Sequence, residues 1–293
     1  MKRLFWAAGL FVAILLPGCR NSSDVGVLLD GAVDSAAAVP APITDANYTN
    51  GYLTPSDVRI AFFKAGLSTA TATAPSFTIF DLGSPAAATA ASLDGSGTTI
   101  GSSPNLPAAG TYTTLSVGMT YIAFVVTANT SDRERFRVYL SSVSSGPGLP
   151  GAVAARDVLI ENPVDSGSYQ WIDTTTALPA STRPANPLKM PSAQLPSGSG
   201  DPFIANITLS SPLTLSPGDK GLFTLSLVAA VHNLFFYDDV NTNGLFDYPP
   251  LSCADPRDGC LSALATPIPP ADFAPAYAGF TASAAAPTPT PTP

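Results

Sequence analysis

Histidine, glutamate and cysteine are nearly absent from this chain of 293 residues. His232 is its one histidine, Glu134 and Glu161 are its only glutamates, and it holds 3 cysteines. Charged residues of all kinds make up only 12% of the chain. Acid–base and nucleophilic catalysis draw heavily on these residue types, so the chain has little material for a catalytic centre.

Basic residues are also scarce. The 13 lysines and arginines are outnumbered by 21 acidic residues, for a net charge of −8. Nucleic-acid phosphates are bound by clustered Lys and Arg side chains, and this acidic chain has no basic run. We therefore expect no nucleic-acid partner.

Helix-favouring composition is missing as well. The chain contains 30 prolines and 23 glycines, together with many serines and threonines. Proline and glycine are poor helix formers, and serine and threonine are indifferent ones. The hydrophobic share of 45% still allows a sizeable core. The composition therefore favours an all-β protein.

The N-terminus has the pattern of an export signal. Lys2 and Arg3 precede an uncharged apolar run over residues 4–16. This run is short for a membrane-spanning helix, which needs about 20 apolar residues. Export also agrees with the charge balance, because losing Lys2 and Arg3 leaves 11 basic residues against 21 acidic ones.

The end of this run, Leu16-Pro17-Gly18-Cys19, resembles the lipobox of bacterial lipoproteins. The family pattern has a large aliphatic residue three positions before the cysteine and a small residue directly before it, as Leu16 and Gly18 supply. Pro17 departs from that pattern. The alternative is an ordinary signal peptide followed by an incidental cysteine.

The resemblance implies that residues 1–18 are removed and that Cys19 becomes a lipidated first residue carrying palmitate-type chains. Two or more acyl chains give stable attachment, so the implied partner is a membrane. Arg20 replaces the aspartate that favours inner-membrane retention in this family. We therefore expect a lipid anchor in the cell envelope, in the outer membrane where two membranes exist.

Residues 19–50 are expected to combine the lipid anchor with a flexible tether, because most of this segment is polar or rich in Ala and Pro. Residues 25–29 form a short apolar patch that could add an edge strand. Residues 51–283 are expected to form the folded region, with a Gly/Pro/Ser-rich break near 142–155. Residues 284–293 are expected to be a disordered Pro/Thr tail.

Short alternating segments bounded by Gly, Pro and Ser predict strands throughout the folded region. They are residues 58–64, 76–82, 111–117, 119–128, 133–141, 156–161, 168–173, 203–209 and 221–231. Residues 83–107 have little to bury and are expected to be a loop with one weak strand. The pattern predicts a β-sandwich or barrel, either one large domain or two small ones.

The segment LPAAGTYTTLSVG, residues 106–118, resembles hairpins of bacterial immunoglobulin-like and transthyretin-like surface modules. The resemblance covers about a dozen residues. It implies an immunoglobulin-like or transthyretin-like β-sandwich, which is the form of the all-β fold that we expect here.

Residues 221–247 combine a core strand with a candidate metal loop. Phe223, Leu225, Leu227, Ala229 and Val231 fall on one face of a strand, while Thr224 and Ser226 point the other way. The oxygen-bearing side chains that follow are spaced as in loops that wrap calcium, with Gly244 at the sharp turn. The expected ligands are Asp239, Asn241, Asn243, the backbone carbonyl of Leu245, and Asp247.

The calcium loop departs from an EF-hand, because Pro250 stands where a bidentate glutamate would be and a strand precedes it. It is more similar to shorter calcium loops of bacterial extracellular β-modules. Its affinity would be weak, with a Kd on the order of 10⁻⁴–10⁻³ M, and its role structural. The alternative is a metal-free turn held by Asn and Asp side chains that bond their own backbone.

Cys253 and Cys260 enclose a short segment, ADPRDG, and predict a disulfide in an exported protein. The alternatives are free or metal-bound thiols. Zinc binding is disfavoured because zinc prefers four ligands and His232 is the single histidine.

Tyr169 and Trp171 share one face of an expected strand. They would form a platform for a sugar ring if exposed, or fill a core if buried, and core packing is the commoner use of such aromatics. Arg133, Arg135 and Arg137 alternate on another strand and are expected to form a solvated face rather than an anion-binding patch.

No assembled catalytic motif is present: there is no Gly-x-Ser-x-Gly segment, no phosphate-binding loop and no helix-borne metal motif. His232 is expected to be a strand-end residue with satisfied hydrogen bonds. The sequence therefore predicts a lipid-anchored, non-enzymatic surface protein with a binding, adhesion or structural role towards a glycan or protein. The alternatives are a carbohydrate-binding module and a secreted hydrolase.

A soluble chain spanning residues 21–283 should unfold at a higher temperature in millimolar calcium than with chelator, because calcium would bind only the folded state. Calcium at roughly ten times Kd would add about 1.4 kcal/mol. Asp239→Ala should abolish this shift in thermal unfolding. No shift in the unsubstituted chain at several millimolar calcium would mean that the loop is a metal-free turn.

Overall fold

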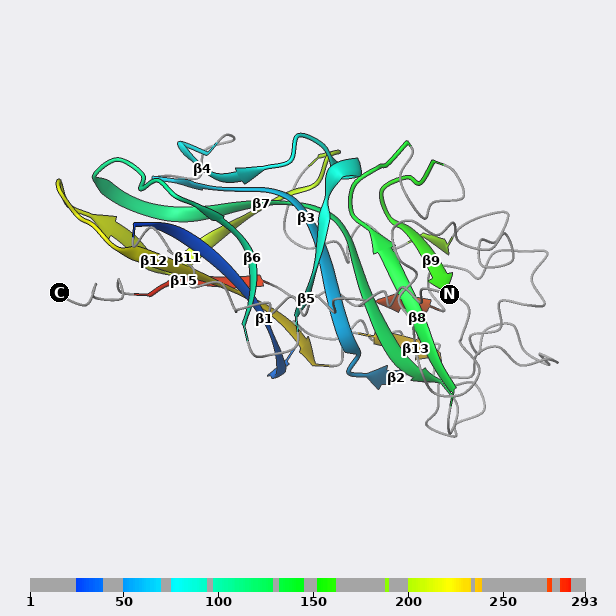
Figure 1. The fold of residues 1–293 in the computed structure, drawn as a ribbon. Coiled ribbons are helices and arrows are strands. Elements are labelled where there is room, and N and C mark those ends of the chain that lie inside the picture. Colours follow the sequence, from blue (N-terminus) through cyan, green and yellow to red (C-terminus); the bar gives the residue numbers. More distant parts are fainter. Residues whose placement is uncertain are drawn as a thin grey trace, which may run out of the picture.

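The computed structural model describes residues 25–38, 50–69, 75–93, 97–128, 132–144, 152–161, 188–189, 200–232, 235–238, 273–275 and 280–285. Within these ranges the single helical element is the 3-10 turn η1 (Pro85–Ala87), and all other regular structure is β-strand. The all-β prediction is confirmed. The finer prediction of a β-sandwich is not, because the main sheet curls until it is nearly closed into a barrel (Figure 1).

The main sheet contains 12 strands. They are β1 (Gly26–Ala38), β3 (Ser56–Ser68), β4 (Phe77–Asp81), β5 (Thr89–Leu93), β6 (Thr98–Ser103), β7 (Gly110–Ala128), β8 (Asp132–Tyr139), β9 (Asp157–Glu161), β10 (Leu188–Lys189), β11 (Ile204–Leu215), β12 (Leu222–His232) and β15 (Phe280–Ala284). A smaller sheet of three strands contains β2 (Asn50–Leu53), β13 (Phe235–Asp238) and β14 (Phe273–Pro275).

The strand order of the main sheet is β10-β9-β8-β7-β11-β15-β12-β1-β6, with β3 on the second edge of β7 and β4 and β5 on the far edge of β3. Strands from before and after residues 142–155 therefore belong to one sheet. In Figure 1, β3 and β7 run side by side across the molecule, as their antiparallel register requires.

Strand β7 joins two segments that the sequence predicted as separate strands. The strand has 19 residues, and residues 114–125 pair with β3 along one edge. On the other edge, Gly110–Gly118 pairs with β11, and Tyr121–Ala128 pairs with β8. Gly118 does not interrupt the strand. A side chain there would lie only 2.5 Å from Phe63 Cζ, so the glycine permits close packing rather than a turn.

Ser141 holds the point where β7 changes partners. Its hydroxyl donates to the Met119 carbonyl at 2.6 Å and accepts from the Phe203 backbone N–H at 2.8 Å. The Met119 N–H in turn donates to the Phe203 carbonyl at 3.2 Å. Ser141 is fully buried. One hydroxyl thus links β7 to the residues that lead out of β8 and into β11.

Between β6 and the β4–β5 edge, where the barrel is nearly closed, the strands meet through side chains and not through a backbone ladder. The Thr98 hydroxyl of β6 donates to the Ser92 carbonyl of β5 at 2.6 Å. A Cβ at Gly101 would collide with the Phe80 ring, and one at Gly31 would lie 2.6 Å from Leu93 Cδ2. These two glycines let side chains of β4 and β5 lie directly against the backbone of β6 and β1.

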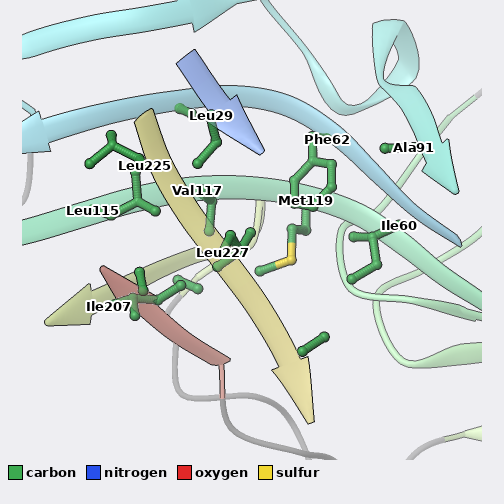
Figure 2. Close-up of a cluster of buried hydrophobic side chains, with 14 of the residues drawn as sticks. Leu29, Ile60, Phe62, Ala91, Leu115, Val117, Met119, Ile207, Leu225 and Leu227 are labelled. Carbon is green, nitrogen blue, oxygen red and sulfur yellow. The ribbon is translucent and has the colours of Figure 1, made fainter. Parts of the chain in front are cut away.

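The core fills the interior of the curled sheet. Figure 2 shows Leu29 of β1, Phe62 of β3, Val117 of β7, Ile207 of β11 and Leu227 of β12 converging on the same space. The alternation predicted for β12 is confirmed, since its apolar positions are all buried: Phe223, Leu225, Leu227, Ala229 and Val231. Burial of this kind contributes about 25 cal/mol per Å² of apolar surface.

The prediction of a tether is wrong for residues 26–38, which form β1. This strand pairs in parallel with β12 and antiparallel with β6, so it lies inside the main sheet. Val27 and Leu29 are completely buried. The apolar patch at residues 25–29 was the part of the sequence that indicated a strand. The Ala, Asp and Ser residues after it are held mainly by backbone pairing, and the sequence therefore shows no apolar alternation there.

The prediction of a loop over residues 83–107 is also wrong for most of its length, which contains η1, β5 and β6. β5 pairs with β3, and β6 pairs with β1. Ala91 and Leu93 are the buried hydrophobic residues of β5. Small residues suffice here because backbone hydrogen bonds to a neighbouring strand hold β5 and β6 in the sheet.

Most other predicted strands are confirmed, with residues 58–64, 76–82, 133–141, 156–161 and 203–209 falling mainly in β3, β4, β8, β9 and β11. The expected strand over residues 168–173 lies outside the described residues.

Ser141→Ala should lower the free energy of unfolding by about 1–3 kcal/mol, because it leaves a buried N–H and a buried carbonyl without this partner. The measurement is chemical denaturation of the purified chain. Ser144→Ala, at a nearby exposed position, is the matched control and should change stability by less than about 0.5 kcal/mol. Equal effects for the two variants would contradict the role of the Ser141 hydroxyl.

Candidate functional site

A pocket of about 130 Å³ lies on the outer face of the main sheet, where β4, β3 and β7 run side by side. Along β3 and β7, Lys64, Gly66, Ser116 and Gly118 alternate with core residues such as Ala65, Leu67 and Val117, and therefore lie on the face away from the barrel interior. The residues that line it are Lys64, Ala65, Gly66, Pro75, Thr78, Phe80, Asp81, Ser116, Gly118 and Ile204.

Two glycines form much of the pocket floor. A Cβ at Gly66 would lie 2.6 Å from the Phe77 carbonyl oxygen and 2.6 Å from Pro75 Cβ. A Cβ at Gly118 would lie 2.8 Å from Lys64 Cγ. The Lys64 stem and the Pro75 ring thus lie close over bare backbone. Glycine inside a strand often marks such a close approach, and here it hollows the outer face.

The charged walls come from neighbouring strands. Lys64 of β3 and Asp81 of β4 are register partners, so their side chains start about 5 Å apart on the same face. The Lys64 ammonium lies 5.5 Å from the centroid of the Phe63 ring. The Asp81 carboxylate accepts a hydrogen bond from the Gly83 backbone N–H at 2.7 Å, which fixes its orientation.

Polar and apolar groups alternate around the rest of the pocket. The Ser116 hydroxyl, on a residue that is only 5% exposed, donates to Asn206 Oδ1 at 2.6 Å. Thr78 adds a second hydroxyl-bearing residue, while Pro75 and Ile204 supply apolar surface. The pocket therefore offers one cation, one carboxylate, hydroxyl groups and apolar walls. The two opposite charges suit a small ligand without net charge.

A second polar feature lies on the outer face of β7 and β8, around Arg137. This residue is 4% exposed, its guanidinium carbon lies 4.6 Å from the Tyr121 ring centroid, and its Nη1 donates to the Tyr139 hydroxyl at 3.4 Å. Val143 and Val153 pack with the two tyrosines in a small cluster. The prediction that Arg137 belongs to a solvated face is wrong.

The reason for this burial is tertiary. A bridge between Val143 and Val153 brings the chain after β8 back over the same face of the sheet. Arginine tolerates such a place because its planar guanidinium stacks on aromatic rings. The side chains of Arg133 and Arg135 lie outside the described residues, so their prediction stays open.

His232 ends β12 and is partly exposed. Its Nδ1 lies 3.4 Å from the Thr54 hydroxyl, which is the hydrogen-bond partner that the structure gives for this ring. This arrangement matches the expected strand-end residue. Among the described residues, no group of three or more His, Cys, Asp or Glu side chains could hold a metal ion.

The remaining predicted site residues lie outside the described residues. They are Cys19, the calcium-loop positions Asp239, Asn241, Asn243, Leu245 and Asp247, the cysteines Cys253 and Cys260, and the aromatics Tyr169 and Trp171. These assignments stay predictions. In the part of the chain that the structure describes, no helix is long and apolar enough to cross a membrane.

Sequence reasoning missed the pocket. Its visible signals are a single lysine in the apolar segment IAFFKAGL and glycines within two strand patterns, at Gly66 and Gly118. These signals mark a special position but do not say which strand lies beside it. The pairing of Lys64 with Asp81 appears only once β3 and β4 are joined.

Comparison with known proteins gives no identity for this fold. No protein-family model matches the chain, and neither a curated protein nor a solved structure matches it.

Proposed function

We propose that this chain is a lipid-anchored surface protein of the cell envelope that binds a ligand and carries out no catalysis. The observation that carries the proposal is the N-terminal segment ending in Leu16-Pro17-Gly18-Cys19. A charged start, a short apolar run and a cysteine after small residues together favour export and lipid attachment over a membrane-spanning helix.

The position of β1 supports this proposal. Cys19 stands only seven positions before Gly26, the first residue of β1. Because β1 is paired on both edges, with β12 and β6, a lipid on Cys19 would be connected almost directly to the main sheet. Such an anchor would hold the whole barrel at the membrane surface rather than on a long flexible arm.

The ligand class that we propose for the outer-face pocket is a neutral carbohydrate. Sugar hydroxyls both donate and accept hydrogen bonds, and the Lys64 ammonium and the Asp81 carboxylate offer one partner of each kind. The C–H face of a sugar ring can pack on apolar surface such as that of Pro75 and Ile204. This is the carbohydrate-binding alternative, carried by a different set of residues from the aromatic pair Tyr169 and Trp171.

A structural calcium ion and a disulfide remain parts of the proposal. The loop from Asp239 to Asp247 follows directly on β13, which pairs with β2 and β14 in the small sheet. A weakly bound calcium ion there would stiffen the exit from that sheet without taking part in chemistry. The Cys253–Cys260 disulfide would close the next short segment.

Cys19→Ala should abolish metabolic incorporation of a palmitate analogue and release the chain from the membrane fraction, because no other residue would carry the lipid. The measurement is fluorescence of the labelled chain after expression in bacterial cells. Cys253→Ala is the matched control and should keep the label. Equal labelling of the Cys19→Ala variant would refute the lipid anchor.

Lys64→Met and Asp81→Asn should each weaken glycan binding at least about tenfold, or 1.4 kcal/mol, because each removes a charge-assisted hydrogen bond while keeping the shape of the wall. The measurement is titration calorimetry against a panel of neutral glycans.

Thr208→Ala, exposed on β11 outside the pocket, is the control for this titration and should bind as the unsubstituted chain does. Unchanged affinity in both pocket variants would place the binding site elsewhere. Failure of the unsubstituted chain to bind any glycan would overturn the ligand class.

A further inference from the structure

We infer that one end of the barrel rests on the lipid bilayer surface. This end, here called the anchor end, consists of Val25, residues 103–110 between β6 and β7, residues 216–221 between β11 and β12, and Ala285. The inference rests on the proposed lipid at Cys19 and adds to it a defined contact surface and a defined orientation of the molecule.

Strand register brings these segments together. Gly26 is the partner of Leu222, and Val27 is the partner of Ser103, so the start of β1 lies beside the start of β12 and the end of β6. Leu215 pairs with Gly110 in the same region. In Figure 1 the turns between β6 and β7 and between β11 and β12 lie at the left of the molecule, where β1 also begins.

Covalent geometry limits how far this end can stand from the membrane. A fully extended chain spans at most about 3.3–3.6 Å per residue, so the seven steps from Cys19 to Gly26 reach about 25 Å. The 13 residues of β1 extend roughly 43 Å away from that point at about 3.3 Å per residue. The anchor end is therefore the part of the barrel that the lipid holds closest to the bilayer.

The charge of the anchor end permits the same orientation. Residues 103–110 contain no charged residue, and residues 216–221 contain only Asp219 and Lys220, which cancel. The Asp219 carboxylate also accepts a hydrogen bond from the Ser216 backbone N–H at 2.7 Å. An anionic headgroup layer would repel an acidic surface within a Debye length of about 10 Å, and this end presents no net charge.

Charged residues of both signs lie toward the opposite end. Asp34 stands in the second half of β1, Asp57 stands at the start of β3, and Asp132 starts β8. Figure 1 shows the start of β8 and the small sheet of β2 and β13 at the side away from the β11–β12 turn. Asp57 is paired there with Arg59 at 3.3 Å, and β8 carries three arginines along with Asp132 and Glu134. The orientation therefore rests on the short link from Cys19 to β1 and not on a difference in charge between the two ends.

The anchor end lies on the headgroups and does not insert. Pro104, Asn105, Ala108, Ala109 and Pro217 are exposed there, and all are small or polar. Among the described residues, the one exposed large hydrophobic side chain is Leu82, at 42%, which follows β4 and lies outside this end. Insertion into the acyl region would need large apolar or aromatic side chains, which this end does not expose.

This orientation has a consequence for the rest of the molecule. With the anchor end on the bilayer, the small sheet of β2, β13 and β14 lies away from the membrane. The outer-face pocket, on the side wall formed by β3, β4 and β7, faces along the membrane plane and stays open to solvent.

The test is site-specific photo-crosslinking of the full chain in bacterial cells. A benzophenone amino acid is placed at Asn105 or Pro217 of the anchor end, and at Asp57 as the equally exposed control. Cross-linking to alkyne-labelled phospholipid should be at least about fivefold stronger at Asn105 and Pro217 than at Asp57, because the short link raises the effective concentration of lipid at that end.

Lengthening the segment between Cys19 and β1 tests whether its short length causes the lipid contact. Inserting about 30 Gly and Ser residues between Arg20 and Val25 should reduce the cross-linking at Asn105 toward that at Asp57, since a flexible linker lowers the effective concentration. Equal lipid cross-linking at all three sites without the insertion, or stronger cross-linking at Asp57, would overturn the inference.

A palmitate label measured on the same samples separates the two proposals. Lipid on Cys19 together with equal cross-linking at both ends would overturn the orientation alone. Absence of lipid on Cys19 would overturn the anchor and the orientation with it.

Discussion

The structure depends on pairing both edges of β7 along most of its length. A buried strand of 19 residues must have hydrogen-bond partners for its backbone on each side. One edge meets β3 over residues 114–125, while the other meets β11 and then β8. At the change of partner the ladder would leave polar groups unsatisfied, and the buried Ser141 hydroxyl supplies both a donor and an acceptor there.

This exchange of partners explains why distant parts of the chain share one sheet. β8 and β9 extend one half of the sheet, and β11 leads through β15 and β12 to β1 in the other. β1 comes from the start of the described chain and β15 from its end. The sheet then curves until β6 meets β4 and β5, where glycines let side chains pack against backbone and nearly close the barrel.

The same use of glycine connects the core with the outer-face pocket. Gly66 and Gly118 stand on β3 and β7, whose inward residues are completely or nearly completely buried. A rigid, well-packed sheet holds Lys64 and Asp81 at fixed places, which lowers the entropy cost of binding a ligand. The proposed anchor acts on the same body, since β1 joins the N-terminal segment to the middle of the sheet.

Local patterns in the sequence were enough for the all-β class and for strands such as β12, because alternation along one strand reports which face is buried. The signal-like N-terminus and the spacing of residues 239–247 are likewise local patterns, and the proposals of a lipid and a calcium ion rest on them. By contrast, β5 and β6 escaped notice because their small residues carry little apolar periodicity.

Only the tertiary structure decided which strands meet. It joined residues 26–38 to β12 in parallel, set Lys64 beside Asp81, and covered Arg137 with the chain that returns after β8. The β1–β12 pairing joins segments almost 200 positions apart, while the other two depend on how neighbouring segments fold back on each other, and periodicity encodes neither. The chain by itself therefore determined where most strands and the candidate anchor lie, while packing between strands determined the pocket and the proposed anchor end.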